Sequence, residues 1–523
     1  MTSTVLNAGK GSLGQALAPQ LQPLTGFTLL AAALAIGFGN FLVVLDTTIA
    51  NVSVPTIAGS LGVSSSEGTW VITAYAVAEA ITVPLTGWLT RKFGAQRVFL
   101  TCYLGFGVLS LLCGMANSMG MLIAGRILLG LCGGPIMPLS QMLLLRIFPK
   151  SQATLATVIW AMTTLIGPVA GPILGGMICD SAGWQWIFFI KVPIALAGGG
   201  LALMLLRGQP DPTEKATIDK GGLALLVLWV GALQIMLDEG RNKDWFASSE
   251  IQILGVIAVI GFIAFVIWEL TTDNPIVDLR IFRHRGFTAA ALTYATGFAA
   301  FFASIVLLPL WLQTNMGYTA TWAGYATGIM GLLAVVSAPM VGKLVERVDP
   351  RLVICLGIVG LGLVSVWRAT FTSDVTFLQM AAPTLLSGPF MVMFFVPVTG
   401  LAIASVAPNE TANAAGLSNF MRTLAGAFAT SLIQTGWSDA QRRNQTELAG
   451  AMTHANRLID HLVAFGADRG KAVFGLTRVV EGQSLMLATI NMFAVVAAVF
   501  GIAALMIWLA PRPKGPIDTT AAH

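Results

Sequence analysis

Charged residues are scarce in this chain. Asp, Glu, Lys and Arg make up 10% of its 523 residues, whereas 56% are hydrophobic and the mean hydropathy is +0.80. Ordinary water-soluble domains carry about 25% charged residues, so the composition excludes that class. Apolar stretches of about 20 residues, long enough to cross a bilayer, recur from Phe27 to the end. The sequence therefore predicts an all-α polytopic membrane protein.

Other absences narrow the function. The four histidines lie outside the apolar stretches, which argues against a haem or metal site within the membrane. No Gly-x-x-x-x-Gly-Lys-[Ser/Thr] motif is present, so the chain carries no nucleotide motor of its own. We expect a transporter rather than an enzyme, with no cofactor and with protons as the coupling ion. The cysteines have no paired spacing and are interpreted as small apolar residues: Cys102, Cys113, Cys132, Cys179 and Cys355.

Fourteen membrane spans are predicted by the apolar stretches. They lie at about 26–50, 69–89, 98–117, 120–145, 153–178, 186–206, 221–238, 251–270, 287–312, 322–342, 352–370, 376–404, 412–436 and 483–509. The first 24 residues lack the pattern of a cleaved signal peptide, so the first span is expected to serve as its own signal. Lys and Arg concentrate in alternate short loops, which predicts both termini in the cytoplasm.

An internal repeat suggests how the spans are organised. The segment from Gly87 to Lys92, after the second span, matches the segment from Gly342 to Arg347, after the tenth. Repeat-built transporters bury their site between two such halves. We predict two six-helix halves at residues 26–206 and 287–510, with a pair of inserted helices between them at 207–286. A cytoplasmic N-terminal segment at 1–25 precedes them, and a cytoplasmic tail at 511–523 follows them.

The second half contains one long polar insert at residues 437–482. Its apolar residues recur at three- and four-residue steps, which favours one or two amphipathic helices: Leu448, Met452, Leu458, Leu462 and Phe465. Two interpretations stay open, a loosely structured connection on the membrane surface and a docking surface for a partner.

Asp46 is the most informative charged residue, because it lies deep in the first apolar stretch. An ionised side chain near the bilayer centre costs roughly 2.5–3.5 kcal/mol, so it needs a functional reason. Arg126, in the fourth span, is expected at a similar depth and able to pair with it. We predict a proton-coupling role for Asp46 against a purely structural one, and for Arg126 the alternative is that it holds helices together.

Two further charges are predicted near the membrane centre. Glu79 is a second candidate proton site and suits a cationic substrate, whereas Arg422 suits an anionic one. Together they indicate either a broad-specificity site or an internal ion pair. Phe301, Phe302 and Met393 are candidate lining residues of an apolar pocket, although core packing is the ordinary explanation. Arg368 and Glu269 stand near span ends, where snorkelling to the interface explains a charge, and receive no role.

Motifs at Leu45–Pro55, Arg126–Gly130 and Ile166–Gly176 resemble those of the fourteen-helix drug:proton antiporters in the major facilitator superfamily. The stretch from Leu45 to Pro55 resembles their first-helix motif, and Arg126-x-x-x-Gly130 their fourth-helix basic motif. The stretch from Ile166 to Gly176 resembles their antiporter motif, in which Gly167, Gly171 and Gly175 make a smooth stripe and Pro168 and Pro172 bend the helix. Ordinary small-residue packing is the alternative explanation for that stripe.

The loop signature of the superfamily is also present, with one departure. Gly87, Arg91, Gly94 and Arg97 match it, but Arg91 stands where the family usually has an acid. The family's acid-dependent latch therefore cannot be transferred, and Glu346 beside Gly342 in the second-half copy is the substitute candidate.

The resemblance implies proton-driven efflux of lipophilic drugs and other toxic compounds across a bacterial inner membrane by alternating access, and hence antibiotic resistance. It also implies partners, a periplasmic membrane-fusion adaptor and an outer-membrane channel, which together form a tripartite exporter. The alternatives are a proton-coupled symporter of a small metabolite and a non-transporting membrane scaffold subunit.

Overall fold

The computed structural model describes residues 26–149, 152–207, 210–213, 217–240, 243–273, 275–407, 410–451, 459–460, 463–464 and 468–512. The predicted segment 1–25 and residues 513–523 of the predicted tail lie outside this part. The described residues are helical and contain no strand. Their helices are α1 (Gly26–Leu61), α2 (Ser65–Gly68), α3 (Trp70–Phe93), α4 (Ala95–Gly114), α5 (Met119–Ile147), α6 (Ala153–Ser181), α7 (Trp186–Phe189), α8 (Lys191–Leu206), α9 (Lys220–Glu239), η2 (Trp245–Ala247), α10 (Ser249–Thr271), η3 (Leu279–Arg283), α11 (Arg285–Thr314), α12 (Ala320–Gly328), α13 (Met330–Arg347), α14 (Pro350–Arg368), α15 (Phe377–Ala404), α16 (Thr411–Ala451), α18 (Arg469–Met506) and η4 (Ile507–Leu509).

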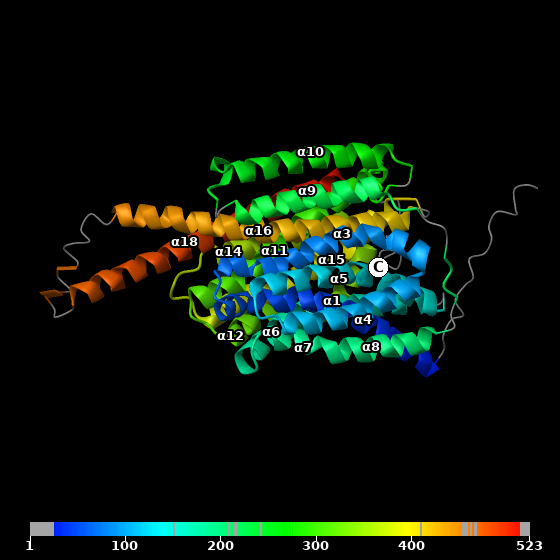
Figure 1. The fold of residues 1–523 in the computed structure, drawn as a ribbon, viewed down its shortest axis with the longest axis horizontal. Helices are drawn as coiled ribbons and strands as arrows, with labels where there is room; N and C mark the ends of the chain where they lie inside the picture. The colour runs from blue at the N-terminus through cyan, green and yellow to red at the C-terminus, as the bar shows by residue number, and fades with distance from the viewer. Residues whose placement is uncertain are drawn as a thin grey trace, which may run out of the picture.

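The helices confirm the predicted fold class. Within the described residues, twelve helical segments are long and apolar enough to cross a membrane, with α7–α8 and α12–α13 each forming one segment. Helices α6 and α16, of 29 and 41 residues, run through the same bundle (Figure 1). These helices account for all fourteen predicted spans.

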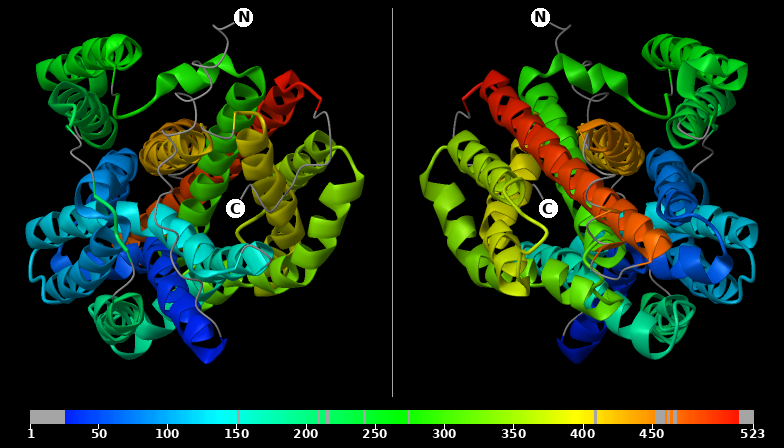
Figure 2. Two further views of the ribbon diagram at one scale, coloured as in Figure 1. Left: turned by 90° about the vertical axis from the view of Figure 1, so that its right-hand side faces the viewer. Right: turned by 90° about the vertical axis from the view of Figure 1, so that its left-hand side faces the viewer.

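The bundle consists of two groups of helices with a further pair at its edge. Viewed along the helices, the first half, α1–α8, and the second half, α11–α18, lie side by side, and α9 and α10 stand at the periphery (Figure 2). Helix α9 packs against α3 of one group and α16 of the other. Gln234 on α9 donates a hydrogen bond to Ser431 on α16, and Thr435 donates one to the Leu237 carbonyl at 3.3 Å. The inserted pair is therefore anchored mainly to the second half.

The first helix is longer than predicted. It continues to Leu61 and carries Pro55 inside it, whereas the predicted span ends near residue 50. Proline removes one backbone donor, but membrane helices tolerate it where neighbouring groups satisfy the freed carbonyl. Val52 and Val54, which lie in this additional length of helix, are buried.

The insert at 437–482 is an extension of two membrane helices. Helix α16 continues to Ala451 and α18 begins at Arg469, so both project beyond the rest of the bundle at the left of Figure 1. We call this projection the hairpin and the end of the bundle that bears it the hairpin end. Leu448 is half-buried on α16, while Met452, Leu458, Leu462 and Phe465 lie outside the described residues. The helical prediction holds for the described part of the insert.

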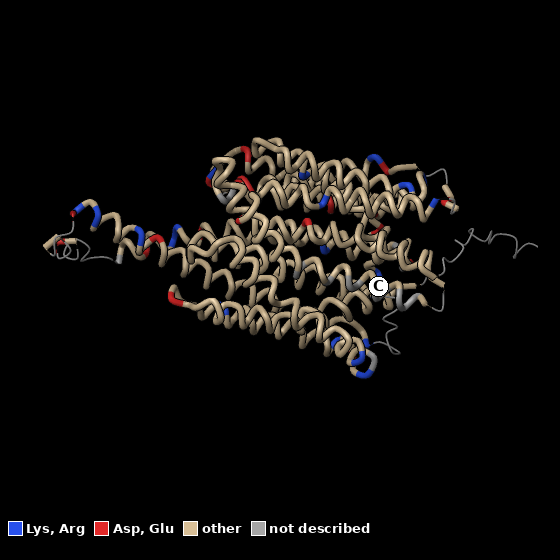
Figure 3. Tube along the Cα trace, turned by 90° about the horizontal axis from the view of Figure 1, so that it is seen from below, with Lys and Arg blue, Asp and Glu red and all other residues tan. Residues whose placement is uncertain are grey.

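Charged residues concentrate at the two ends of the bundle and on the hairpin. Figure 3 shows few of them along the middle of the helices. That distribution fits helices that cross a lipid bilayer, because an unpaired charge in hydrocarbon is costly. The few charges in the middle therefore mark the candidate site.

Candidate functional site

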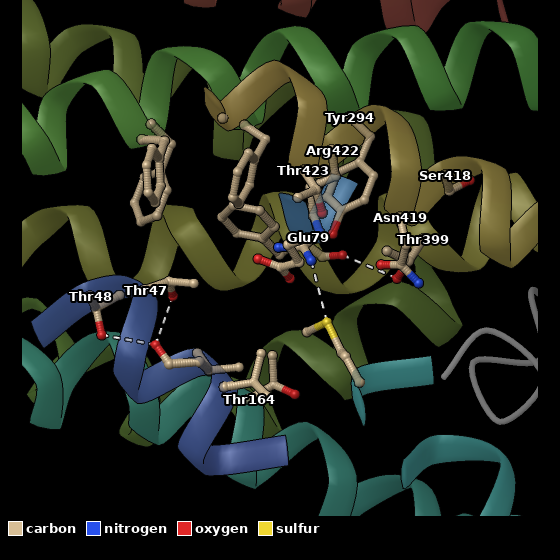
Figure 4. A pocket seen from close by; sticks show the side chains of 18 of the residues that line it. Thr47, Thr48, Glu79, Thr164, Tyr294, Thr399, Ser418, Asn419, Arg422 and Thr423 are labelled. Carbon is tan, nitrogen blue, oxygen red and sulfur yellow. Dashed lines mark hydrogen bonds between the residues drawn. The ribbon is translucent and has the colours of Figure 1, made fainter. Parts of the chain in front are cut away.

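A cavity of about 200 Å³ lies between the two halves. Helices α1, α3, α5 and α6 of the first half and α11, α15 and α16 of the second supply its walls. Most of the lining is apolar, and the polar groups come mainly from α1 and α16 (Figure 4). A mostly apolar cavity with a few convergent polar groups is the usual form of a small-molecule site.

An aromatic wall forms the second-half side of the cavity. The Phe298 and Phe302 rings stack with centroids 5.6 Å apart, and Phe301 meets Phe395 edge-on at 5.2 Å. Tyr294 extends the same cluster. The rings offer broad apolar faces without a fixed hydrogen-bond pattern, which suits lipophilic ligands of different shapes.

Glu79 and Arg422 lie together in this cavity (Figure 4). No salt bridge joins them, and the Arg422 guanidinium instead contacts the Met137 sulfur at 3.3 Å and lies 5.0 Å from the Phe298 ring centre. The Arg422 Nε and the Ser418 and Thr423 hydroxyls are buried without partners among the described residues. Of the two alternatives left open by the sequence, the internal ion pair is not formed as a salt bridge in this structure, and the unpartnered groups are available to a ligand.

Of the three apolar residues predicted to line a pocket, the cavity contains two. Phe301 and Phe302 are in its wall, whereas Met393 is not. Met391 and Phe395, four residues apart on α15, face the cavity. Successive residues turn by about 100° around a helix, so Met393 points away from them, and its backbone packs beside Gly357 of α14.

Asp46 lies behind the cavity wall in a buried ion cluster. Arg126 on α5 contacts its Oδ2 at 2.5 Å, and the Lys191 ammonium on α8 pairs with Oδ1. All three side chains are 0% exposed. The predicted pair of Asp46 and Arg126 is therefore formed, although neither residue lines the cavity, while the neighbouring Thr47 and Thr48 do.

Both cations of the cluster have additional partners. Arg126 donates to the Val71 carbonyl at 2.7 Å and stacks 4.4 Å from the centre of the Tyr75 ring. The Lys191 ammonium lies 4.6 Å from the Phe188 ring centre. Ring faces attract cations, which offsets part of the cost of burial. The cluster nevertheless holds two positive charges against one negative charge.

Lys191 was not predicted. It stands at the start of α8 in Phe189-Ile190-Lys191-Val192-Pro193, inside a predicted span, and a lone lysine within an apolar stretch was the available signal. Sequence position alone did not reveal its partner, because the pairing depends on which face α8 turns toward α1.

The glycine stripe of α6 packs directly on α1. A Cβ added at Gly171 would collide with the Thr48 side chain, and one at Gly175 would lie 2.8 Å from the Ile49 carbonyl oxygen. Gly167 meets Val44 in the same way, and the Thr48 hydroxyl donates to the Gly167 carbonyl at 3.1 Å. The close approach requires glycine at these positions. The side chain of Pro168 lies outside the described residues.

The same helix closes the cavity toward the hairpin end. Gly324 of α12 sits on the Pro172 carbonyl, and Gly176 sits on the Ala320 carbonyl. The Asp180 carboxylate accepts a hydrogen bond from the Thr321 amide at 2.7 Å, and Gln313 of α11 donates to the Val52 carbonyl of α1 at 2.8 Å. The two halves therefore meet at the hairpin end.

The loop signature uses an acid from elsewhere in the sequence. Gly94 has φ +91°, which favours glycine, and Asp211, in the segment after α8, lies against it. Its carboxylate accepts hydrogen bonds from the Gln96 and Arg97 amides at 3.3 and 3.2 Å, at the N-terminus of α4. Gly87 and Gly342 have open space around them. Arg91 and Arg97 are exposed, and the Glu346 side chain lies outside the described residues.

The interpretation that Arg368 and Glu269 snorkel to the membrane interface is wrong, because both side chains are buried. Arg368 is only 6% exposed and donates to the Thr384 hydroxyl at 3.0 Å, while Glu269 is 0% exposed and accepts from the Val277 amide at 3.0 Å. Packing around each helix end encloses both side chains, which sequence position did not reveal.

Comparison with known proteins supports this description. The family model of the Major Facilitator Superfamily matches residues 36–430. The multidrug export protein EmrB of Escherichia coli K12 is 40% identical over 501 residues, which is 95% of this chain and 98% of that protein. The chain belongs to the Major Facilitator Superfamily. The fatty acid resistance protein FarB of Neisseria gonorrhoeae, another similar protein, is 37% identical over 94% of this chain and 98% of its own length.

Solved structures confirm the major facilitator fold. A POT family transporter in complex with 5-aminolevulinic acid aligns with a TM-score of 0.64 at 13% identity, covering 93% of this chain and 97% of that chain. A bacterial homolog of the lysosomal transporter Spinster, inward-facing and unoccupied, aligns with a TM-score of 0.59 at 15% identity, covering 94% and 100%. At such identities the likeness concerns the fold alone, and the predicted family resemblance is confirmed by the superfamily match and the similar sequences.

Proposed function

We propose that this chain exports lipophilic drugs and other toxic compounds across the bacterial inner membrane, in exchange for protons. The observation that carries the proposal is the cavity between the halves, in which an aromatic wall faces Glu79 and Arg422. A cargo molecule buries its apolar body against the rings, while either charged side chain meets its polar group. The multidrug export and resistance functions named for the similar proteins support this cargo class.

The contacts at the hairpin end support transport by alternating access. In this conformation α6 and α12 close that end, and in the opposite conformation they separate to release cargo there. With both termini in the cytoplasm, the hairpin end is external. The structure then corresponds to the inward-facing conformation, in which cargo enters from the cytoplasm or the inner leaflet.

Proton coupling is assigned chiefly to Asp46, with Glu79 as a second acid. The threonine neighbours of Asp46 line the cavity, and Thr48 also bonds to α6. A movement of α6 against α1 thus shifts the segment that carries Asp46. Such a shift changes the distance of Asp46 from Arg126 and Lys191, and with it the affinity of the carboxylate for a proton. Resident cofactors have no part in this scheme.

Transport in proteoliposomes tests the proposal. Purified protein is reconstituted with a lipophilic cationic dye and a pH gradient is imposed. We expect dye movement against its own gradient, driven by protons moving in the opposite direction. Co-movement of dye and protons would favour a symporter, and no movement under any gradient would favour a scaffold subunit.

The hairpin is the proposed contact for a periplasmic membrane-fusion adaptor, which in turn meets an outer-membrane channel. Its α18 arm exposes apolar side chains, with Phe474 68% and Val479 59% exposed. If the hairpin stands in the periplasm, these residues need a protein partner. Phe474→Ser/Val479→Ser should abolish adaptor co-purification from native envelopes while dye transport in liposomes persists. Retained co-purification would refute the contact.

A further inference from the structure

Arg368 is a buried cation without a counter-charge among the described residues. It ends α14, and its guanidinium donates to the Thr384 hydroxyl at 3.0 Å and lies 5.6 Å from the Phe493 ring centre. Its Nε is buried with no hydrogen-bond partner. No salt bridge to a carboxylate is formed within the part of the chain that the structure describes.

A small cavity of about 20 Å³ adjoins this guanidinium. That is room for one or two groups of the size of a water molecule. Its walls combine apolar side chains with hydroxyls of four helices, and they contain no acid: Ser304, Thr327, Ser365, Thr384 and Ser387. The Ser304 hydroxyl is also buried without a partner. Arg368 and Ser304, which carry the unpartnered Nε and hydroxyl, therefore line the same cavity.

The first half shows what a buried cation requires here. There Arg126 and Lys191 are both held by the Asp46 carboxylate. In the second half the cavity at Arg368 offers hydroxyls and apolar side chains, and none of its lining residues is acidic. A charged group enclosed in a low-dielectric interior needs a paired charge, because hydroxyls alone do not replace its lost hydration.

We propose that the Arg368 cavity binds one small monovalent anionic group. The guanidinium supplies the charge and Nε–H, and Ser304 supplies a hydroxyl donor. Two sources fit this chemistry. One is a free halide, and the other is the carboxylate of an amphipathic cargo molecule that reaches in from the central cavity, with which this cavity shares Phe301 and Ile305. The second source rests on the proposed export function, whereas the first does not.

Thermal unfolding of the purified protein in nanodiscs measures the binding directly, without transport. The protein is titrated with sodium chloride against sodium gluconate at equal ionic strength, since gluconate is too large to enter the cavity whole and has no apolar chain to lie in the central cavity while its carboxylate reaches in. A parallel titration uses sodium octanoate. A ligand that binds only the folded state raises the unfolding temperature in a saturable way. We expect such a rise, and we expect it to be lost in Arg368→Gln and weakened in Ser304→Ala.

Arg351→Gln serves as the matched control, because it removes an arginine that is paired with Asp349 at 2.8 Å outside this cavity. A chloride response that depends on Arg368 supports the site with a free halide as its ligand. An octanoate response that depends on Arg368, without a chloride response, supports the cargo carboxylate. If wild type responds to neither, or if Arg368→Gln and Ser304→Ala keep the full response, the site does not exist. Should Arg368→Gln not fold, Ser304→Ala and the wild-type titrations still decide.

Discussion

The charges of the Asp46 cluster lead to a prediction about the stability of the protein. One carboxylate is enclosed with two cations, all of them fully buried. Asp46→Asn leaves Arg126 and Lys191 facing each other with no negative charge. Removing one partner of a buried ion pair costs about 3–5 kcal/mol, because the remaining charge stays desolvated. We expect a loss of stability in that range.

Lys191→Met should behave differently, although it removes a residue of the same cluster. The remaining Asp46 and Arg126 balance each other, and methionine packs well against the flanking rings of Phe106 and Phe188. We expect a change of within about 1 kcal/mol, since replacing a buried charge by an apolar group of similar volume is often nearly neutral. The double variant Asp46→Asn/Lys191→Met leaves a single cation and should recover about 1–3 kcal/mol relative to Asp46→Asn.

Equilibrium unfolding of the four proteins in lipid nanodiscs measures these differences as a double-mutant cycle. Wild type and Lys191→Met should unfold together, Asp46→Asn well before them, and the double variant in between. If Lys191→Met is as destabilising as Asp46→Asn, or if the two changes simply add, charge balance does not govern the cluster.

Three other predictions follow from the geometry. Glu79→Gln should lower export of cationic dyes at least about tenfold, because one lost charge contact in a dry site is worth about 1.4 kcal/mol or more. Arg422→Gln should leave the export of these dyes unchanged. Dye-efflux assays measure both variants, and equal losses of export in the two would count against this assignment. Gly94→Ala should destabilise the protein by about 1–3 kcal/mol, because an alanine is strained at φ +91° and its Cβ would collide with Asp211. Gly87→Ala, where a Cβ has open space, should not destabilise it. Thermal unfolding compares the two variants, and equal effects would contradict the strain argument. Gly324→Val should force α12 from the Pro172 carbonyl and lengthen the distance between spin labels at Met177 and Trp322, while Gly342→Val leaves it unchanged; an unchanged distance in Gly324→Val would show that this contact does not close the hairpin end.

The number and order of helices could be predicted from hydrophobic runs, because a bilayer demands about 20 apolar residues per span. The ends of these helices could not, since lipid sets no limit on a helix that continues into water. Helices α16 and α18 run on into the hairpin, and α1 continues past Pro55, for that reason.

The candidate site was predicted as a set of charges, but their arrangement required the fold. Depth along a helix follows from residue counting and brought Asp46 and Arg126 to one level. Direction around a helix does not follow from counting, so Lys191 was missed, Met393 was placed in a cavity it does not line, and Arg368 was assigned to the interface. The contact of Asp211 with the Gly94 turn could not be predicted, because Asp211 lies far along the sequence and outside the predicted spans.

The central claim is that protons bound at Asp46 drive export. The folded double variant Asp46→Asn/Lys191→Met tests it most directly, because it lacks the acid while keeping the cluster's net charge. In proteoliposomes it should exchange dye for dye at the wild-type rate and yet fail to concentrate dye when a pH gradient is imposed. If the double variant still concentrates dye as wild type does, Asp46 is not the coupling site.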